Sequence, residues 1–269
     1  MKLIWAVAGL LIVVGLLLVL MRVKQRPASV PERPRAAANA PGPLQLNCGT
    51  GLRPPVAEII DYFQRRTGVQ VRVNYGASNL LLGQLKLTGR GDLFLPGDDF
   101  YIKEAEREGL VHASYAVALF VPVIQVARGN PLRVKTIADL ARGDVRLGVA
   151  DERAAAIGRI TPAIFATNGV PFATVRSNIV FTSITAPELG QAVALGHVDA
   201  AIVWRAVAWQ YARETEIMEI PAEHNVLSHV AVAVLAGSKN KETALEFVKC
   251  LQGTVGREIF RKYHYDLLP

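Results

Sequence analysis

The segments LQLNCGTGLRPP (residues 44–55) and VQVRVNYGASNL (residues 69–80) decide the fold. Each joins a strand-like apolar stretch to a helix start through a short loop that carries a hydroxyl residue, Thr50 or Ser78. Backbone N–H groups at a helix start have no partner within the helix and lie at the positive end of its dipole. Because such ends attract anions, two of them in neighbouring loops predict an oxyanion cradle.

Strand and helix patterns alternate after these loops. The expected elements are a helix from Pro54 to Gly68, a strand over 69–75, a helix after Ser78, a strand over 91–95, and a helix from Asp98 or Asp99 to Glu108. Such a series builds a parallel sheet, with ligands at the carboxyl ends of its strands.

The second half of the chain is also α/β. The patterns predict a long strand over 117–127, a helix from Thr136 with Asp139 in the capping-box position, a strand over 145–149, helices over 154–166 and 187–195, a strand over 200–203, a helix through Tyr211, a strand over 229–235, and helices over 241–251 and 254–263. We therefore expect two lobes with a cleft between them. Lobe 1 would comprise residues 44–120 with 229–269, lobe 2 would comprise 121–228, and the strands near Val121 and Val230 would act as hinges.

The first 43 residues differ from the rest. Residues 3–20 carry no charge and are about long enough for a transmembrane helix, so we predict an uncleaved anchor within 1–24; a long signal peptide cut in the alanine run at 36–40 is the alternative. Residues 25–43 are rich in proline and alanine and predict an extended tether. More cations follow the apolar segment than precede it, which favours a cytoplasmic location for residues 44–269. The function inferred below requires these residues on the other side of the membrane.

Charge and motifs exclude several functions. Six cations and one glutamate precede residue 44, which leaves only +2 of the formal +7 on the body and argues against nucleic-acid binding. The Gly49-Thr50-Gly51 run fails as a dinucleotide fingerprint because Pro54 takes the place of the third glycine. The five histidines have no metal-ligand spacing. We therefore expect no catalytic residue, no metal ligand and no cofactor.

Some polar residues allow two interpretations. Cys48 and Cys250 are expected as structural thiols, although a bridge between them is an alternative. The pair Asp98-Asp99 could hold a cation, but helix capping explains it better. Asp92, at a strand end, is expected to have a structural role.

Several motifs together carry a family resemblance. They are TGV at 67–69 leading into YGAS at 75–78, GDLFL at 91–95, VPV at 121–123 with GNP at 129–131, GHVDAAIVW at 196–204, and GREIFRKY at 256–263. From residue 44 to 266 the chain resembles the periplasmic solute-binding proteins of ABC importers, in particular those for molybdate and tungstate. The resemblance implies a two-lobed α/β fold of type II, with a hinge and a central cleft. It also implies a periplasmic or extracytoplasmic monomer that hands a tetrahedral oxyanion to a membrane permease; residues 3–21 would anchor it.

The resemblance also implies donors from the first lobe. In the first loop, the position that carries a hydroxyl in the family is Gly51 here, and Thr50 lies one place earlier. In the second loop, the position of the family's serine is Ser78 here, and Asn79 follows it. Thr50 can replace the missing hydroxyl. The alternative for Thr50 and Ser78 is that they only cap helices.

In the second lobe the resemblance implies backbone N–H donors near Ile157 and Ala186. A tyrosine hydroxyl is also implied, at the position that Trp204 occupies. The indole N–H can replace that hydroxyl, or Trp204 is a packed core aromatic. The changed donors could also shift the preferred anion to sulfate or phosphate, and a membrane-tethered anion sensor is a further alternative. Arg153 and Arg159, near the same loop, could clamp an oxyanion but are better explained as surface charges.

Overall fold

The computed structural model describes residues 42–268. The predicted membrane anchor and almost all of the proline-rich tether lie outside these residues. Within the described range, no helix combines the length and the apolar character that a membrane crossing requires.

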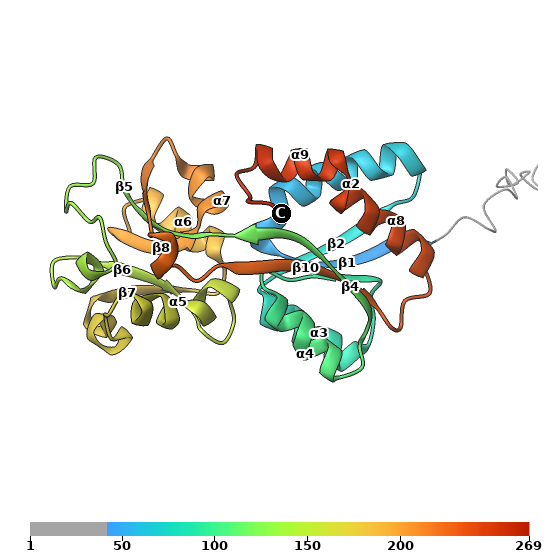
Figure 1. Cartoon of the computed structure of the whole chain (residues 1–269), viewed down its shortest axis with the longest axis horizontal. Helices are drawn as coiled ribbons and strands as arrows, with labels where there is room; N and C mark the ends of the chain where they lie inside the picture. Colours follow the sequence, from blue (N-terminus) through green and yellow to red (C-terminus); the bar gives the residue numbers. More distant parts are fainter. Residues whose placement is uncertain (1–41, 269) are drawn as a thin grey trace, which may run out of the picture. The chain divides into compact units, whose positions relative to one another are not determined.

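The first of two sheets has the strand order β2-β1-β3-β10-β4 (Figure 1). Its strands are β1 (Leu44–Gly49), β2 (Val71–Gly76), β3 (Leu93–Leu95), β4 (Val111–Phe120) and β10 (Ser228–Leu235). The first three run parallel, and β10 is antiparallel to both β3 and β4. The helices α2 (Arg53–Thr67), α8 (Lys241–Gln252) and α9 (Thr254–Lys262) cover one face, and α3 (Ser78–Thr88) and α4 (Asp99–Arg107) cover the other. We call this sheet with its helices the first lobe.

The second sheet has the order β7-β6-β8-β5-β9. Its strands are β5 (Pro122–Ala127), β6 (Leu147–Ala150), β7 (Ile179–Ser183), β8 (Ala200–Trp204) and β9 (Thr215–Glu219). Together with α5 (Ala156–Thr167), α6 (Ala186–Ala194) and α7 (Arg205–Ala208), it forms what we call the second lobe. The order alternates strands and helices in both lobes, so the predicted two-sheet α/β fold is confirmed. The exact lobe boundaries, at 120/121 and 228/229, stay a prediction.

The single strand predicted over 117–127 is wrong. It is two strands in different sheets, β4 and β5, and Val121 joins them. Pro122 has no N–H and therefore cannot extend the ladder of β4. The chain returns from the second sheet to the first just before β10. Because Ser228 at the start of β10 pairs with Phe120 at the end of β4, the two connections between the sheets lie side by side. Val230 lies inside β10 rather than at the crossing.

Three other expectations need correction. The helix predicted from Thr136 is only a 3-10 turn, η3 (Ala138–Ala141), because the backbone becomes extended at Arg142. The helix predicted through Tyr211 is the short α7, followed by a 3-10 turn, η5 (Trp209–Tyr211). The sequence analysis missed β7 and β9; β9 has the sequence TEIME, which carries only two apolar residues in five.

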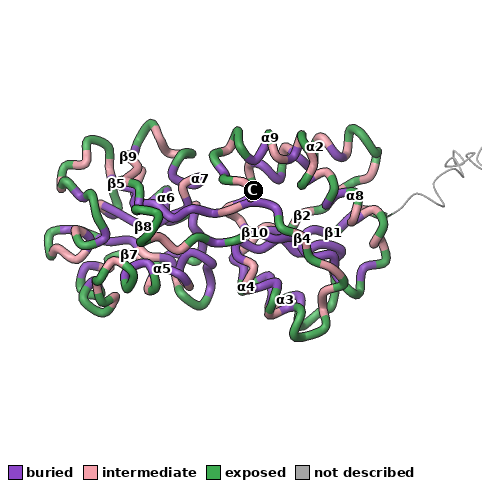
Figure 2. The backbone as a smooth tube through the Cα atoms, viewed as in Figure 1, coloured by how far each residue is buried: buried purple, intermediate pink, exposed green. Residues whose placement is uncertain are grey.

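The predicted apolar stripe of α2 is buried, as are most strand residues of both sheets (Figure 2). Phe63 of α2 packs edge-on against Phe247 of α8, with ring centroids 5.2 Å apart. The helix ends at Gly68, whose φ of 73° is a left-handed conformation that glycine adopts without strain. Cys48 is buried and Cys250 half-buried, and both are free thiols in the structure.

Candidate functional site

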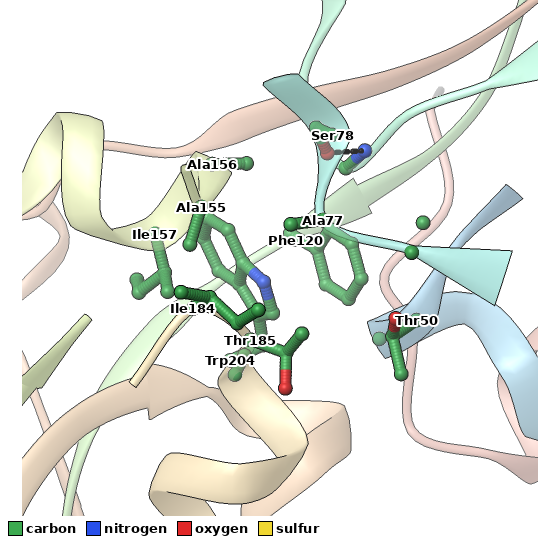
Figure 3. A pocket seen from close by; sticks show the side chains of 15 residues that line it. Thr50, Ala77, Ser78, Phe120, Ala155, Ala156, Ile157, Ile184, Thr185 and Trp204 are labelled. Atoms are coloured by element: carbon green, nitrogen blue, oxygen red, sulfur yellow. Dashed lines mark hydrogen bonds between the residues drawn. The ribbon is translucent and has the colours of Figure 1, made fainter. Parts of the chain in front are cut away.

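Four helical segments begin at one small cavity between the two lobes (Figure 3). They are the 3-10 turn η2 (Thr50–Leu52), which leads into α2, and the helices α3, α5 and α6. The cavity has a volume of about 30 Å³. Its lining residues are Gly49, Thr50, Gly51, Gly76, Ala77, Ser78, Gly97, Phe120, Ala155, Ala156, Ile157, Ile184, Thr185, Ala186 and Trp204. The site therefore joins the start of η2 and three further helix starts, where free N–H groups and the helix dipoles favour an anion.

Among the residues that the structure describes, none with a charged side chain lines the cavity. The polar side chains are the hydroxyls of Thr50, Ser78 and Thr185 and the indole N–H of Trp204, and each of them can donate a hydrogen bond. No cluster of potential metal ligands occurs within residues 42–268. The cavity therefore offers neutral donors to a ligand, and it has neither a carboxylate to accept a proton nor a cation to form a salt bridge.

Ser78 lines the cavity, and its side chain does not cap α3. The N-cap of α3 is Ala77, and no side chain caps this helix. Instead the buried Ser78 Oγ accepts a hydrogen bond of 3.0 Å from the backbone N–H of Gly97. This bond fixes the oxygen, and none of the described residues accepts the hydroxyl proton. The Ser78 hydroxyl can therefore donate to a ligand, and the capping alternative is wrong.

Thr50 and Gly51 form the first-lobe edge of the cavity. The Thr50 side chain caps no helix and makes no hydrogen bond within the described range. The Gly51 carbonyl accepts a hydrogen bond from the Tyr265 hydroxyl. Burial raises the pKa of Tyr265 well above its usual value, so this phenol stays a neutral donor. The loop is thereby held against the C-terminal segment.

Trp204 is a packed aromatic residue, as one of its two sequence-based interpretations predicted, and it also lines the cavity. It is only 2% exposed, and its ring stacks on Phe120 with centroids 4.6 Å apart and planes at 13°. At the same time it lines the cavity, and the indole N–H has no acceptor among the described residues. Trp204 is thus a packed aromatic residue that keeps a free donor at the cavity (Figure 3).

The second lobe offers main-chain donors at α5 and α6. Ile157 and Ala186 lie in the first turns of these helices, where N–H groups have no helical partner. Thr185, the N-cap of α6, accepts the Glu188 N–H at 3.4 Å and was missed by the sequence analysis. The sequence Thr185-Ala186-Pro187-Glu188 fits the capping-box pattern, which could have identified this hydroxyl.

Asn79 does not belong to the cavity. It is exposed and absent from the lining. Its backbone N–H donates instead to the carbonyl of Ala154 in the second lobe, at 3.2 Å. The backbone N–H of Asn79 therefore connects the lobes and is not free for a ligand.

The two arginines of the second-lobe loop do not line the cavity either. Arg159 forms an ion pair of 2.9 Å across the lobes with Asp98, which is 5% exposed. Asp98 also caps α4 through the Phe100 N–H, as predicted, and accepts from Ser228 at 2.6 Å. Arg153 lies at a separate hollow on the second lobe. Arg159 thus links α5 of the second lobe to the N-cap of α4 in the first.

Asp92 has the predicted structural role. Its carboxylate accepts from the Gln45 N–H at 2.8 Å and from the Ser238 hydroxyl at 2.6 Å. These bonds tie β1 to the loop after β10, away from the cavity lining.

Sequence comparison places the chain among binding proteins. The profile of a family described as bacterial extracellular solute-binding protein matches residues 44–266. A protein of Haemophilus influenzae, called a binding protein, is 30% identical over 213 residues, which cover 78% of this chain and 86% of the relative. The molybdate-binding protein ModA of Mycobacterium tuberculosis H37Rv is 25% identical over 236 residues, or 87% of each protein.

Solved structures share the fold. The periplasmic molybdate-binding protein of Azotobacter vinelandii superposes with a TM-score of 0.74 and 17% identity, over 84% of this chain and 99% of its own. The sulfate-binding protein SubI of Mycobacterium tuberculosis gives 0.75 and 16% identity, over 85% of this chain and 88% of its own. At such identities the likeness concerns the fold alone.

Proposed function

This chain belongs to the family of bacterial extracellular solute-binding proteins, and from that premise we propose that it captures a tetrahedral oxyanion, molybdate or tungstate, between its two lobes. The family consists of binding proteins, so the function is capture and release without catalysis. The molybdate-binding relative supports the choice of anion, because it aligns over 87% of this chain.

One observation carries the proposal: neutral donors from both lobes converge on a cavity without charged side chains. A dianion loses its hydration shell on burial, which is tolerable only when fixed donors meet its oxygen atoms. Three hydroxyls, one indole N–H and the first-turn N–H groups of α5 and α6 supply such donors. The number and the fixed positions of these groups suit a small anion with four oxygen atoms.

The lining also favours an anion without a proton. A protonated anion would present an O–H group, and no carboxylate in the lining could accept it. Molybdate, tungstate and sulfate are fully deprotonated at neutral pH, whereas phosphate keeps a proton. The site should therefore reject phosphate, and size should separate sulfate from the larger molybdate and tungstate.

Ligand entry requires the lobes to separate. The cavity is small and bounded by residues of both lobes, and the bonds from Asn79 and Asp98 cross between the lobes beside it. We propose hinge closure on the anion, with the two crossings near Val121 and Ser228 as the hinge. A closed complex would then be handed to an ABC permease.

The cellular setting follows from the same proposal. The family is extracellular, so the binding domain would act on the outer face of the cytoplasmic membrane, as a monomer. The apolar segment at residues 3–21 would anchor it there through the proline-rich tether.

Isothermal titration calorimetry of the full chain in mild detergent tests the anion. We expect molybdate and tungstate to bind one to one, sulfate to bind at least about 100-fold more weakly, and phosphate to give no heat. Absence of heat with all four anions would contradict the proposal. Tight binding of sulfate alone would move the proposed function to that anion.

A further inference from the structure

A buried chain of hydrogen bonds leads from one of the two lobe crossings to the cavity. It begins at Ser228, the first residue of β10, where the chain returns from the second lobe to the first. The Ser228 hydroxyl is 1% exposed and lies 2.8 Å from the carbonyl oxygen of Gly97. The N–H of Gly97 in turn donates to Ser78 Oγ at 3.0 Å, as the dashed line in Figure 3 shows. Gly97 therefore connects the crossing to a hydroxyl at the cavity.

Gly97 has no side chain of its own to hold it in place. It lines the cavity where the lobes meet, and a β-carbon built on it would lie 3.3 Å from Ala156 Cβ of α5 and 3.6 Å from Ser78 Oγ. This space has little room for a side chain, so the two backbone hydrogen bonds fix the position of Gly97. If Gly97 shifts, the N–H that holds the Ser78 oxygen shifts with it.

The same serine also bonds the residue that joins the lobes. Ser228 Oγ lies 2.6 Å from Asp98 Oδ2, and Asp98 Oδ1 accepts from Arg159 of α5 at 2.9 Å. A hydroxyl has one proton, so the Gly97 carbonyl and the Asp98 carboxylate share the proton of Ser228. Since Arg159 belongs to the second lobe, the complete set of bonds forms only where the lobes are in contact.

We infer that Ser228 is a positioning residue of the anion site. It lies outside the cavity lining, holds Gly97 by its carbonyl, and through the Gly97 N–H fixes the oxygen of Ser78 so that the hydroxyl proton points to the ligand. The inference rests on the proposed function, because it assigns a role in the same site. Its consequence is that Ser228 affects anion affinity only through Ser78.

A double-mutant cycle on the full chain tests this consequence. Ser228→Ala should weaken molybdate binding about fivefold, because Gly97 is released and the Ser78 hydroxyl loses its fixed direction. In a Ser78→Ala background the same substitution should change the affinity less than about twofold, since no hydroxyl remains to be oriented. Calorimetry gives each dissociation constant.

Ser238→Ala is the matched control for lost stability. Ser238 is also a buried serine of the first lobe, and its hydroxyl donates to a carboxylate, that of Asp92, at the same distance of 2.6 Å. Both alanine variants should lower the melting temperature by about 2–6 °C. Only Ser228→Ala should weaken molybdate binding, because the bond of Ser238 lies away from the cavity lining.

Hydrogen exchange at the Gly97 amide gives a readout that needs no ligand. Nuclear magnetic resonance of the chain with isotope-labelled glycine follows this amide. Ser228→Ala should speed its exchange at least about tenfold, whereas Ser238→Ala should leave it unchanged. If Ser228→Ala fails to fold, Ser228→Cys takes its place, because its S–H is a weaker donor at the same position.

The outcomes separate this inference from the proposed function. Unchanged affinity in Ser228→Ala, equal losses in Ser228→Ala and Ser238→Ala, or additive losses in the cycle would overturn the positioning role, while the anion proposal would stand. If the unchanged protein binds no oxyanion, the proposed function fails, and the exchange of the Gly97 amide decides. Unchanged exchange in Ser228→Ala then overturns the role of Ser228, and faster exchange supports its hold on Gly97.

Discussion

The two lobes bring different sets of donors to the same cavity. The first lobe contributes side chains, the hydroxyls of Thr50 and Ser78, on loops that follow β1 and β2. The second lobe contributes the Thr185 hydroxyl and the Trp204 indole N–H among mostly apolar side chains, and adds main-chain N–H groups at the starts of α5 and α6. Side-chain donors can be removed by substitution, whereas main-chain donors depend on the helix start itself. Affinity should therefore be most sensitive to substitutions in the first lobe.

The largest effect is expected from Ser78→Ala. The variant loses a hydroxyl donor and leaves the buried Gly97 N–H without its acceptor. A hydrogen bond to a charged group contributes about 1.5–3 kcal/mol, so molybdate affinity should fall about 10- to 100-fold. Calorimetry checks this, with Ser177→Ala, at an exposed residue of the segment η4 (Phe172–Asn178), as the control. An unchanged affinity would remove Ser78 from the site.

Thr185→Val should have a smaller effect on affinity, about five- to tenfold, because the nearby main-chain donors of α6 remain. The variant also loses the N-cap of α6, which should lower the melting temperature by about 2–4 °C. Thr185→Ser keeps the hydroxyl and should restore both quantities. A loss as large as that of Ser78→Ala would contradict the difference between the lobes.

Asp98→Asn tests the contact between the lobes. Asparagine still caps α4, but the attraction to Arg159 is lost, so closure and molybdate affinity should weaken about threefold. Since salt screens a partly exposed ion pair, raising the salt concentration should weaken molybdate binding by the unchanged protein and not by the variant. The matched control is Asp99→Asn, because Asp99 pairs with Lys103 within α4. Equal salt dependence in the unchanged protein and Asp98→Asn would show that the bridge does not support closure.

Acidic pH should lower the stability of the fold, whereas the affinity of the cavity for the anion should not depend on pH near neutrality. The Lys135 N–H holds the pKa of Asp139 below its usual value against the opposing effect of burial, and Thr136 and Arg142 each lower it further by a lesser amount. The ionised carboxylate therefore stabilises the second lobe above the unfolded pKa, and this contribution is lost as the pH falls through the folded pKa.

The melting temperature of the unchanged protein should fall between pH 7 and acidic pH, and Asp139→Asn should accordingly make this fall smaller by about 1–2 °C. No lining residue titrates near neutrality, so molybdate affinity should stay constant from pH 6 to 8. Calorimetry at these pH values and thermal unfolding check both statements. An affinity that changes tenfold in this range would require a titratable group at the ligand.

The sequence predicted the first lobe better than the second. The α2 stripe, the glycine at its end and the hydroxyl loops have local signals, and the structure contains all of them. The break at Val121 was missed because the apolar run continues across it, although Pro122, which cannot extend the ladder of β4, marks the position. β9 was missed because its sequence lacks a clear apolar pattern.

The residues of the site were also predicted only in part. Thr50, Gly51, Ser78, Ile157, Ala186 and Trp204 were predicted and do line one cavity. Asn79 was misplaced because sequence spacing does not tell which first-turn N–H groups face the ligand and which bond the other lobe. The Gly97 bond and the Asp98–Arg159 pair join residues far apart in the chain, and only the folded structure brings them together.

The most direct test is a crystal structure of the chain grown with tungstate, in which anomalous scattering locates the metal atom. We expect one strong peak in the cavity, with anion oxygen atoms within hydrogen-bond distance of Ser78 Oγ, Trp204 Nε1 and the Ala186 N–H. A peak at another place, or none at saturating tungstate, would contradict oxyanion capture between the lobes.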